Sequence, residues 1–316
     1  MIGSGMVDLE KLYSGDRISV ARAVSSVEDD KAGSVDLLKS IFPKTGRAYR
    51  IGITGPPGAG KSTIASRLTR YYRDKGLTVG VIAVDPTSPF TGGALLGDRI
   101  RMADVEGDEG VFIRSMASRG SLGGLSKKAI EAADVLDASG KDIVIMETVG
   151  VGQSELDIAG AADTTLVVLV PESGDSIQAM KAGLMEIADF FVLNKADRAG
   201  ADQAVMSIQM ILNFRKHDGW MPGVVKAVAS EGSGIAEIAA KVAEHRAFLQ
   251  QGGELLKKRR QRQKDRIRDL VVNRLRIDFW TEERTVLLEG RMNVVMKLES
   301  TPYDLAEELI NTFRHK

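Results

Sequence analysis

The stretch Arg50–Thr63, RIGITGPPGAGKST, decides the fold of this 316-residue chain. Its opening run RIGIT is apolar and β-branched, which is typical of a buried strand, and the apolar periodicity after Lys61 predicts a helix to about Lys75. Gly55–Ser62 fits the pattern G-x-x-x-x-G-K-[ST], whose glycines let main-chain amides turn inward towards phosphate oxygens. The helix that follows adds the positive end of its dipole. The stretch therefore predicts a nucleotide phosphate site.

Two side chains of this loop have separate tasks. Lys61 can reach the β- and γ-phosphates, and Ser62 offers a hydroxyl to Mg²⁺. The alternative is a plain glycine turn at the start of a helix, which the strand before the loop and the helix after it disfavour. We expect the whole loop to contact the nucleotide, through Gly55, Pro56, Pro57, Gly58, Ala59, Gly60, Lys61, Ser62 and Thr63.

Short apolar runs alternate with amphipathic stretches through the middle of the chain. Seven of these runs are bounded by turn signals: RIGIT, TVGVIAVD, VFIRSM, DIVIMET, TTLVVLV, DFFVLN and VVKAVAS. This alternation predicts an α/β fold in which helices cover both faces of a mainly parallel central sheet. We expect a helical N-terminal extension at 1–45, a P-loop domain at 46–251 and a helical C-terminal arm at 252–316.

The stretch DFFVLNKAD closes an apolar strand with the pattern N-K-x-D. A carboxylate at Asp197 can accept hydrogen bonds from N1–H and the 2-amino group of guanine, whereas adenine would face it with an acceptor. Lys195 can lay its methylene stem along the purine face, and Asn194 can tie this loop to the phosphate loop. Together with the phosphate loop, the pattern predicts guanine rather than adenine.

A later loop, VASEG, completes the expected base site. It lacks the Ser-Ala start that is common in the last guanine-contacting loop of GTPases. Main-chain amides of Ala229 and Ser230 can still serve the guanine oxygen. We therefore add Val228, Ala229 and Ser230 to the expected nucleotide contacts.

Two carboxylates end apolar strands, Asp85 in TVGVIAVD and Glu147 in DIVIMET. Parallel strands present their carboxyl ends at the edge where ligands bind, and hydrated Mg²⁺ takes one or two carboxylates there. We assign Glu147 mainly to orienting metal-bound water. Asp85 and Asp98 are candidates for the metal or its water shell, with Ser62; the alternatives are a turn aspartate and a helix-cap aspartate.

Six stretches together resemble the methylmalonyl-CoA mutase-associated GTPases, the MeaB/ArgK type within the G3E group of P-loop GTPases: GPPGAGKST, VDPTSPFTGGALLGDRIRM, RSMASRGSLGGLS, ETVGVGQSE, DSIQAMKAGLME and NKAD. The resemblance implies a Mg²⁺-dependent GTPase that converts GTP to GDP and phosphate. It also implies a chaperone of an adenosylcobalamin-dependent acyl-CoA mutase, methylmalonyl-CoA mutase or a close relative. Such proteins gate delivery of the cobalamin cofactor from an adenosyltransferase and protect the mutase from inactivation.

The resemblance also assigns residues by position in these stretches. It gives phosphate and magnesium to Lys61, Ser62, Asp85, Asp98 and Glu147, and guanine to Asn194, Lys195 and Asp197. A third switch loop that couples the nucleotide to the mutase holds Asp175, Gln178 and Lys181. Taken alone, these three lie at helical spacing, and a solvated helix face is the alternative.

One position departs from the wider GTPase pattern. Many small GTPases present a glutamine after the metal carboxylate, and it orients the attacking water. Counted from Glu147, that position is Val151, which cannot form the hydrogen bond. Gln153 can take the role only after the loop rearranges. Our catalytic candidates are Lys61, Asp98, Glu147 and Gln153.

The segment Lys257–Arg268 carries eight basic residues and one acid. Apolar residues recur from its end onward at helical spacing on one face: Ile267, Leu270, Val271 and Leu275. A helix of this kind suits an arm that docks outside its own domain, and the resembled family uses its C-terminal helices to form homodimers. A plain solvated helix and a nucleic-acid arm are the alternatives.

Composition excludes several classes of protein. Forty-three Lys and Arg residues balance forty-three Asp and Glu residues, which disfavours a generic nucleic-acid binder. The absence of cysteine excludes disulfides, thiolate metal sites and cysteine nucleophiles. No apolar run approaches the ~20 residues of a membrane span, and the opening residues lack a secretory signal. We expect a cytoplasmic protein with neither a nucleic-acid nor a membrane partner.

Two other functions compete with the mutase chaperone. Proteins of this type have been labelled as kinases or ATPases that energise basic amino-acid transport. Asn194 and Asp197 argue for guanine instead, and no segment resembles a site for an acceptor substrate. A regulatory GTPase with another partner also fits the motifs.

Overall fold

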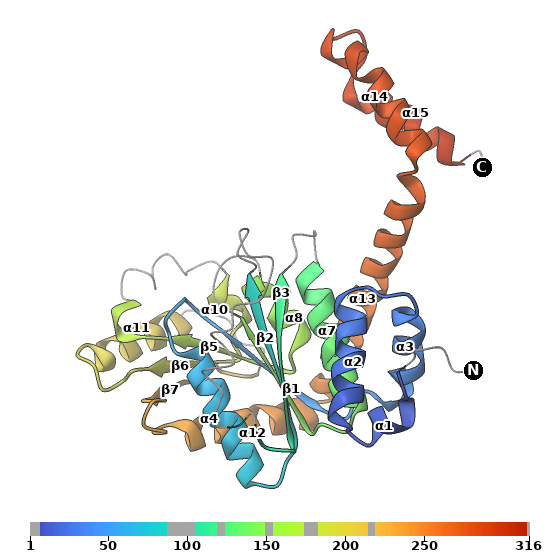
Figure 1. Ribbon diagram of the computed structural model, residues 1–316. Coiled ribbons are helices and arrows are strands. Elements are labelled where there is room, and N and C mark those ends of the chain that lie inside the picture. The colour runs from blue at the N-terminus through green and yellow to red at the C-terminus, as the bar shows by residue number, and fades with distance from the viewer. Residues whose placement is uncertain are drawn as a thin grey trace. The chain divides into compact units, whose positions relative to one another are not determined.

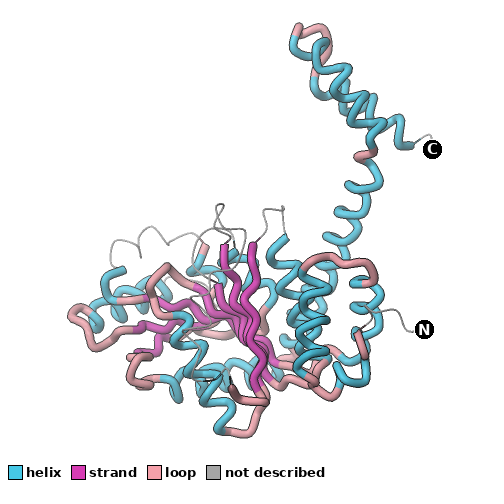
Figure 2. The backbone as a smooth tube through the Cα atoms, viewed as in Figure 1, coloured by secondary structure: helices cyan, strands magenta, loops and turns pink. Residues whose placement is uncertain are grey.

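Seven strands form one parallel sheet in the part of the chain that the structure describes (Figure 2). The computed structural model describes residues 7–86, 105, 107–118, 124–148, 154–173, 183–213 and 219–314. The strands are β1 (Tyr49–Thr54), β2 (Val79–Pro86), β3 (Val111–Ser118), β4 (Ile143–Thr148), β5 (Thr164–Leu169), β6 (Phe190–Asn194) and β7 (Val224–Ala227). Their order is β3-β2-β4-β1-β5-β6-β7, and every neighbouring pair is parallel. The predicted α/β fold with a mainly parallel sheet is confirmed.

One face of the sheet is covered by the helix after the phosphate loop and the helix after β7. These are α4 (Lys61–Asp74) and α12 (Ile235–Gln251). Ile64 and Ile238 from these helices pack in one apolar cluster with Ile51 of β1, and none of the three is exposed. Strands β1, β4, β5 and β6 are buried along their whole length, as strands covered on both faces must be.

The other face is covered by helices from two parts of the chain (Figure 1). Over β2 and β4 lies α7 (Gly124–Ala138), and over β4 and β1 lies α8 (Ser154–Ala161). Over β5 and β6 lie α10 (Leu184–Ile187) and α11 (Ala201–Asn213). A short turn, η2 (Pro171–Ser173), follows β5. The N-terminal helices are α1 (Leu9–Tyr13), α2 (Arg17–Glu28) and α3 (Ser34–Ile41), followed by η1 (Phe42–Lys44). Helices α2 and α3 pack against α7, and α1 packs against α2.

The strand order reverses at β1: β2, β3 and β4 lie on one side of it, and β5, β6 and β7 lie on the other. This reversal positions the site. β1 lies between β4 and β5, and the next strand in the chain, β2, lies beyond β4. Ligands of parallel sheets bind at the carboxyl ends of strands where the order reverses in this way. The phosphate loop leaves β1 at that point.

The C-terminal helices belong to a separate compact unit. The chain divides into Met1–Arg259 and Arg260–Lys316, so that α13 (Glu254–Phe279) begins in the first unit and continues in the second. In the second unit α14 (Glu282–Met296) and α15 (Pro302–Arg314) pack as a hairpin. Within the described residues, none of the helices is both long and apolar enough to cross a membrane.

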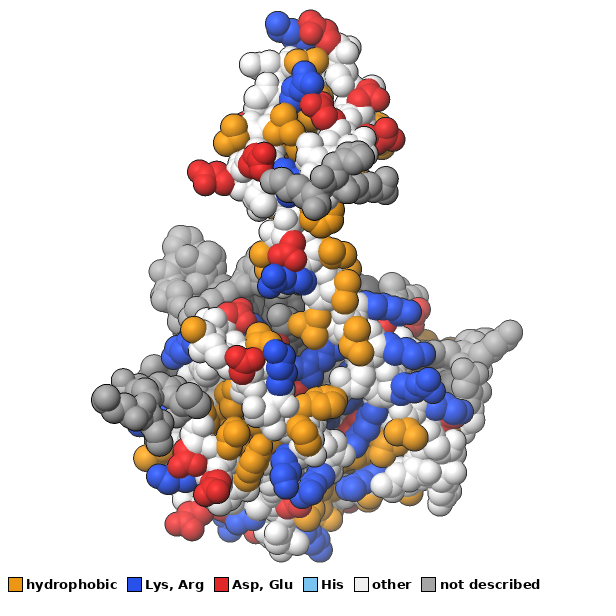
Figure 3. All heavy atoms as spheres, turned by 90° about the vertical axis from the view of Figure 1, so that its right-hand side faces the viewer, with side chains coloured by type: hydrophobic (Ala, Val, Ile, Leu, Met, Phe, Trp, Pro, Cys, Tyr) orange, Lys and Arg blue, Asp and Glu red, His pale blue; other side chains and the backbone are white. Residues whose placement is uncertain are grey.

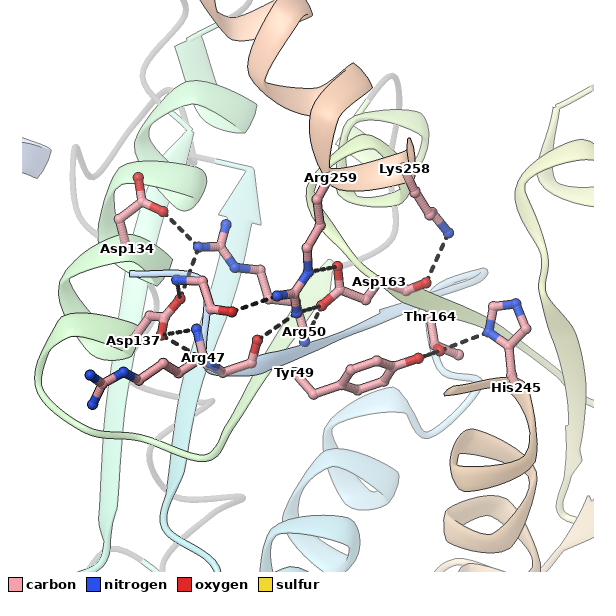
Figure 4. Close-up of polar contacts among 12 residues, drawn as sticks. Arg47, Tyr49, Arg50, Asp134, Asp137, Asp163, Thr164, His245, Lys258 and Arg259 are labelled. Atoms are coloured by element: carbon pink, nitrogen blue, oxygen red, sulfur yellow. Dashed lines mark hydrogen bonds and ion pairs between the residues drawn. The ribbon is translucent and has the colours of Figure 1, made fainter. Parts of the chain in front are cut away.

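A buried carboxylate holds the chain where it enters β1 (Figure 4). Asp137 of α7 accepts hydrogen bonds from the main-chain amides of Gly46, Arg47 and Ala48, at 2.6, 3.1 and 2.9 Å. The guanidinium of Arg50 lies 3.7 Å from the same carboxylate. Because four donors surround one buried anion, the amino end of β1 is fixed to α7.

A second buried carboxylate, Asp163, extends this network to α13 (Figure 4). It accepts from the amide of Arg50 at 3.1 Å and from the guanidinium of Arg259 at 2.7 Å. Lys258 donates to the main-chain oxygen of Asp163 at 2.9 Å. The last residues of the first unit are therefore bound to the amino-terminal edge of the sheet, opposite the phosphate loop.

A neutral polar cluster lies beside these carboxylates in Figure 4. The hydroxyls of Tyr49 and Thr164 are 2.5 Å apart, and the Thr164 hydroxyl lies 2.8 Å from Nδ1 of His245. Burial lowers the pKa of His245 below its usual value of 6.5. The imidazole is therefore neutral near pH 7 and takes part as a hydrogen-bonding group, not as a cation.

Replacing Asp137 with alanine tests the first carboxylate. We expect Asp137→Ala to lower the free energy of unfolding by about 3 kcal/mol, because three buried amides lose their acceptor. Asp137→Asn keeps an acceptor oxygen and should have a smaller effect. Urea denaturation measures both, with Glu244→Ala, which removes an exposed ion pair with Lys241, as the control. Equal stability of Asp137→Ala and the control would contradict this role.

Candidate nucleotide site

Two glycines of the phosphate loop occupy positions that no other residue could take. Gly55 and Gly60 have φ of +136° and +88°, in the region that favours glycine. A Cβ at Gly55 would lie 2.2 Å from the carbonyl oxygen of Val168, and one at Gly60 would lie 2.2 Å from Nδ2 of Asn194. The phosphate loop therefore packs, through its glycines, against β5 and against the loop Asn194–Asp197, called the base loop here.

The ammonium of Lys61 lies inside the curve of this loop. It donates to the carbonyl oxygens of Gly55 and Pro56, at 2.8 and 2.9 Å. The side chain begins at the first residue of α4 and is buried. Its charge is therefore placed at the amino end of the helix, where the phosphate groups are expected.

The predicted magnesium ligands Ser62 and Glu147 are brought together. The Ser62 hydroxyl donates to the Glu147 carboxylate at 2.5 Å, and both side chains are buried. Glu147 on β4 pairs in register with Ile53 of β1 and with Ala83 of β2. Asp85 lies two positions after Ala83 on β2, at the same edge of the sheet, and its side chain lies outside the described part of the chain.

Asn194 joins three loops through a single side-chain amide. Nδ2 donates to the carbonyl oxygen of Ala59 in the phosphate loop at 2.8 Å. Oδ1 accepts from the main-chain amide of Ala229 in the later loop at 3.0 Å. Lys195 adds a second tie to the phosphate loop, from Nζ to the carbonyl oxygen of Gly58 at 2.8 Å. The base loop and the phosphate loop therefore hold one another in place.

The carboxylate predicted to read guanine is accessible. Asp197 is exposed and lies in the turn between β6 and α11. The side chain of its neighbour Arg198 is paired at 2.5 Å with Glu172 of η2. This ion pair holds the pKa of the Glu172 carboxyl below its usual value.

The later loop differs from the expectation at one amide. We expected main-chain amides of both Ala229 and Ser230 to serve the guanine oxygen, with Val228 beside them. The amide of Ala229 is already used by Asn194, and that of Val228 donates to the carbonyl oxygen of Ser233 at 3.0 Å. In the described part of the chain, Ser230 is the member of this loop whose amide stays available to a ligand.

Sequence reasoning missed Arg67 of α4. Its guanidinium donates to the carbonyl oxygens of Ala229 and Ser230. A lone arginine on an exposed helix face carries no signal of its own in the sequence. The partners are main-chain atoms, so no residue type in the later loop indicated the contact.

Several predicted residues fall on parts of the chain that the structure does not describe. They are Asp98, Val151, Gln153, Asp175, Gln178 and Lys181. Their assignments stay predictions. The structure assembles the described part of the site from the phosphate loop, Ser62 with Glu147, and the loops around Asn194 and Ala229.

The comparison with known proteins identifies the family. The family model described as "Methylmalonyl Co-A mutase-associated GTPase MeaB" matches residues 20–284. The chain belongs to this family. It is 39% identical to GTPase ArgK of Escherichia coli, over 91% of each chain. It is 31% identical to the methylmalonic aciduria type A homolog of Mus musculus, over 96% of this chain and 78% of that protein.

A solved structure agrees with this assignment. The crystal structure of the LAO/AO transport system kinase superposes with a TM-score of 0.75, at 30% identity and with coverage of 97% of this chain and 96% of that one. The predicted family and the P-loop fold are confirmed. The protein is a GTPase that binds guanine nucleotide and hydrolyses GTP.

Changing the base-reading carboxylate should change the preferred base. Asp197→Asn replaces a double acceptor with an amide, which suits the 2-oxo group of xanthine better than the 2-amino group of guanine. We expect GTP binding to weaken by about 2–4 kcal/mol and XTP binding to improve, measured by calorimetry. Asp202→Asn, an exposed aspartate paired with Lys226, is the control. Wild-type protein that binds ATP as tightly as GTP would contradict the base-site assignment.

Proposed function

We propose that this GTPase is a chaperone of an adenosylcobalamin-dependent acyl-CoA mutase. In this role it gates delivery of the cobalamin cofactor from an adenosyltransferase and protects the mutase from inactivation. The family match carries the proposal, because a model named for association with methylmalonyl-CoA mutase spans residues 20–284. The mouse relative, named for methylmalonic aciduria, supports the same role.

The geometry of the site suits a nucleotide-dependent switch. Asn194 couples the loops that would contact phosphate and base, so that both respond to one bound nucleotide. The partner would then sense the nucleotide through loops at the same edge of the sheet. Asp175, Gln178 and Lys181 are the sequence-based candidates for that contact.

We also propose that hydrolysis depends on Mg²⁺. The Ser62 hydroxyl and the Glu147 carboxylate, 2.5 Å apart at the phosphate edge, are the oxygen ligands that this ion takes beside nucleotide phosphates. When bound, the ion would neutralise charge on the phosphate oxygens. Glu147 would orient a water of its shell, and Asp85 on the neighbouring strand would be a further candidate.

A transport kinase is the competing function, and it takes its support from the name of the solved relative. Asn194 and Asp197 favour guanine over the adenine that a kinase commonly uses. A regulatory GTPase with some other partner is the remaining alternative. Binding and stimulation by a mutase separate these functions.

Mutase-dependent GTP turnover tests the proposal directly. Because Val151 stands where a water-orienting glutamine is expected, basal hydrolysis should be slow, and a cognate acyl-CoA mutase should raise it. Lys181→Ala should leave basal turnover nearly unchanged and remove most of the stimulation. Lys75→Ala, an exposed lysine at the opposite end of α4, is the matched control. Fast basal turnover, or equal stimulation of both variants, would defeat the proposal.

We propose in addition that the C-terminal arm forms a homodimer. Beyond Arg259, α13 exposes several large apolar side chains, and hydrophobic side chains lie on its surface in Figure 3. The most regular of them are Ile267, Leu270, Val271 and Leu275, each 43–59% exposed. A second copy fits this stripe, because two-fold pairing lets one apolar patch cover an identical one.

Charge on this stripe should break the dimer. The double variant Leu270→Glu and Leu275→Glu places four carboxylates in the proposed interface, and we expect a monomeric mass by sedimentation at micromolar concentration. Ile18→Glu, which alters an exposed apolar residue of α2, should keep the wild-type mass. A wild-type protein that is itself monomeric would overturn the arm's role.

A further inference from the structure

The side chain of Arg67 binds the loop Val228–Gly232, the last loop of the base site, through two successive carbonyl groups. Its Nε donates to the oxygen of Ala229 at 3.3 Å, and a terminal guanidinium nitrogen donates to the oxygen of Ser230 at 2.8 Å. Arg67 lies on α4, the helix that begins at the phosphate loop. One planar guanidinium therefore fixes two adjacent peptide groups relative to that helix.

The loop itself is a tight turn, and the hydrogen bonds from Arg67 add to those within the turn. The amide of Glu231 donates to the oxygen of Val228 at 3.0 Å, and that of Gly232 to the oxygen of Ala229 at 3.2 Å. The preceding amide, on Ala229, is held by Asn194. The turn is thus bound from two sides, by Asn194 on the base loop and by Arg67 on α4.

The hydrogen bonds from Arg67 set the direction of one main-chain donor, the N–H of Ser230. The oxygen of Ala229 and the N–H of Ser230 belong to the same planar peptide, and in a trans peptide they point in opposite directions. Fixing that oxygen on Arg67 therefore aims the N–H away from α4. Ser230 is exposed, and its amide meets no acceptor in the described part of the chain.

A fixed N–H beside Asn194 suits guanine and not adenine. The 6-position of guanine carries an oxygen acceptor, whereas that of adenine carries an amino donor that would face the N–H with a second donor. Asp197 would read the N1–H and the 2-amino group. The Ser230 amide would read the oxygen, so the two groups contact different positions of the base.

We propose that Arg67 is a positioning residue for guanine selectivity, which aims the Ser230 amide at the 6-oxygen of the base. The proposal rests on the guanine site around Asn194 and Asp197. It gives α4 two tasks, since its first turn serves the phosphates and Arg67, on a later turn, sets the donor for the base. Arg67 acts through the loop and does not itself touch the nucleotide.

The test compares nucleotides that differ at one position of the base. 6-Thio-GDP keeps the N1–H and the 2-amino group but offers a weaker acceptor at position 6, and IDP lacks only the 2-amino group. The ratio of the 6-thio-GDP and GDP dissociation constants reports the Ser230 amide. The ratio for IDP and GDP reports Asp197. Titration calorimetry gives both ratios for each protein.

We expect wild-type protein to prefer GDP over 6-thio-GDP by about fivefold or more, and Arg67→Ala to lose most of that preference. The IDP ratio should stay at its wild-type value in this variant. Arg67→Lys can donate to one carbonyl and should recover part of the preference. Arg70→Ala, which breaks an exposed pair with Asp74 on the same helix, is the matched control and should behave as wild type.

Two outcomes would overturn the positioning role of Arg67, and a third would contradict the guanine site on which it rests. An unchanged 6-thio-GDP preference in Arg67→Ala would overturn the positioning role. An equal loss of the preference for GDP over 6-thio-GDP and over IDP in that variant would also overturn it, because Arg67 would then only support the fold of the site. A wild-type protein with no preference for GDP over IDP would contradict the guanine site itself.

Discussion

The side-chain amide of Asn194 is the contact on which the site depends. It is buried, and it satisfies a carbonyl of the phosphate loop and an amide of the last loop at once. The three segments are far apart in the chain, and the sheet brings them to one edge by placing β6 two strands from β1. A buried amide with both ends satisfied favours a single arrangement, since losing either partner leaves a polar group without water. This contact also requires glycine at position 60, because a Cβ there would lie 2.2 Å from Nδ2.

The elements of the fold could be predicted because their signals are local. An apolar β-branched run such as Arg50–Thr54 is a strand wherever both faces are covered, and its boundaries follow from the glycine loop that ends it. The order of the strands could not be predicted in this way. β1 lies between β4 and β5 because of pairings such as Ile53 with Glu147, and nothing near β1 in the sequence encodes them. The carboxylates of Asp137 and Asp163 were missed for the same reason, because their partners include main-chain amides that any residue provides.

The residues of the site likewise fall into those that local sequence predicts and those that depend on contacts between distant segments. Glycine, lysine and serine in the phosphate loop are required by local chemistry, so their roles could be predicted from Gly55–Ser62 alone. The contact between Ser62 and Glu147 followed from one further rule, that carboxyl ends of parallel strands share an edge. Which amide of the later loop is available could not follow from residue types, because Ala229 and Ser230 carry the same main-chain N–H group and only its surroundings differ. The structure decides it through Asn194 and Arg67.

The two ends of β1 use one kind of chemistry for opposite purposes. At the amino end the amides of residues 46–48 bind an internal anion, the Asp137 carboxylate, which never leaves. At the carboxyl end the amides of the glycine loop are shaped for an anion that comes and goes, the nucleotide phosphate. Because the strand is fixed at its amino end by a permanent partner, nucleotide release need not displace β1. We therefore expect changes of nucleotide to act on the loops at the carboxyl edge, where we propose that the partner protein binds.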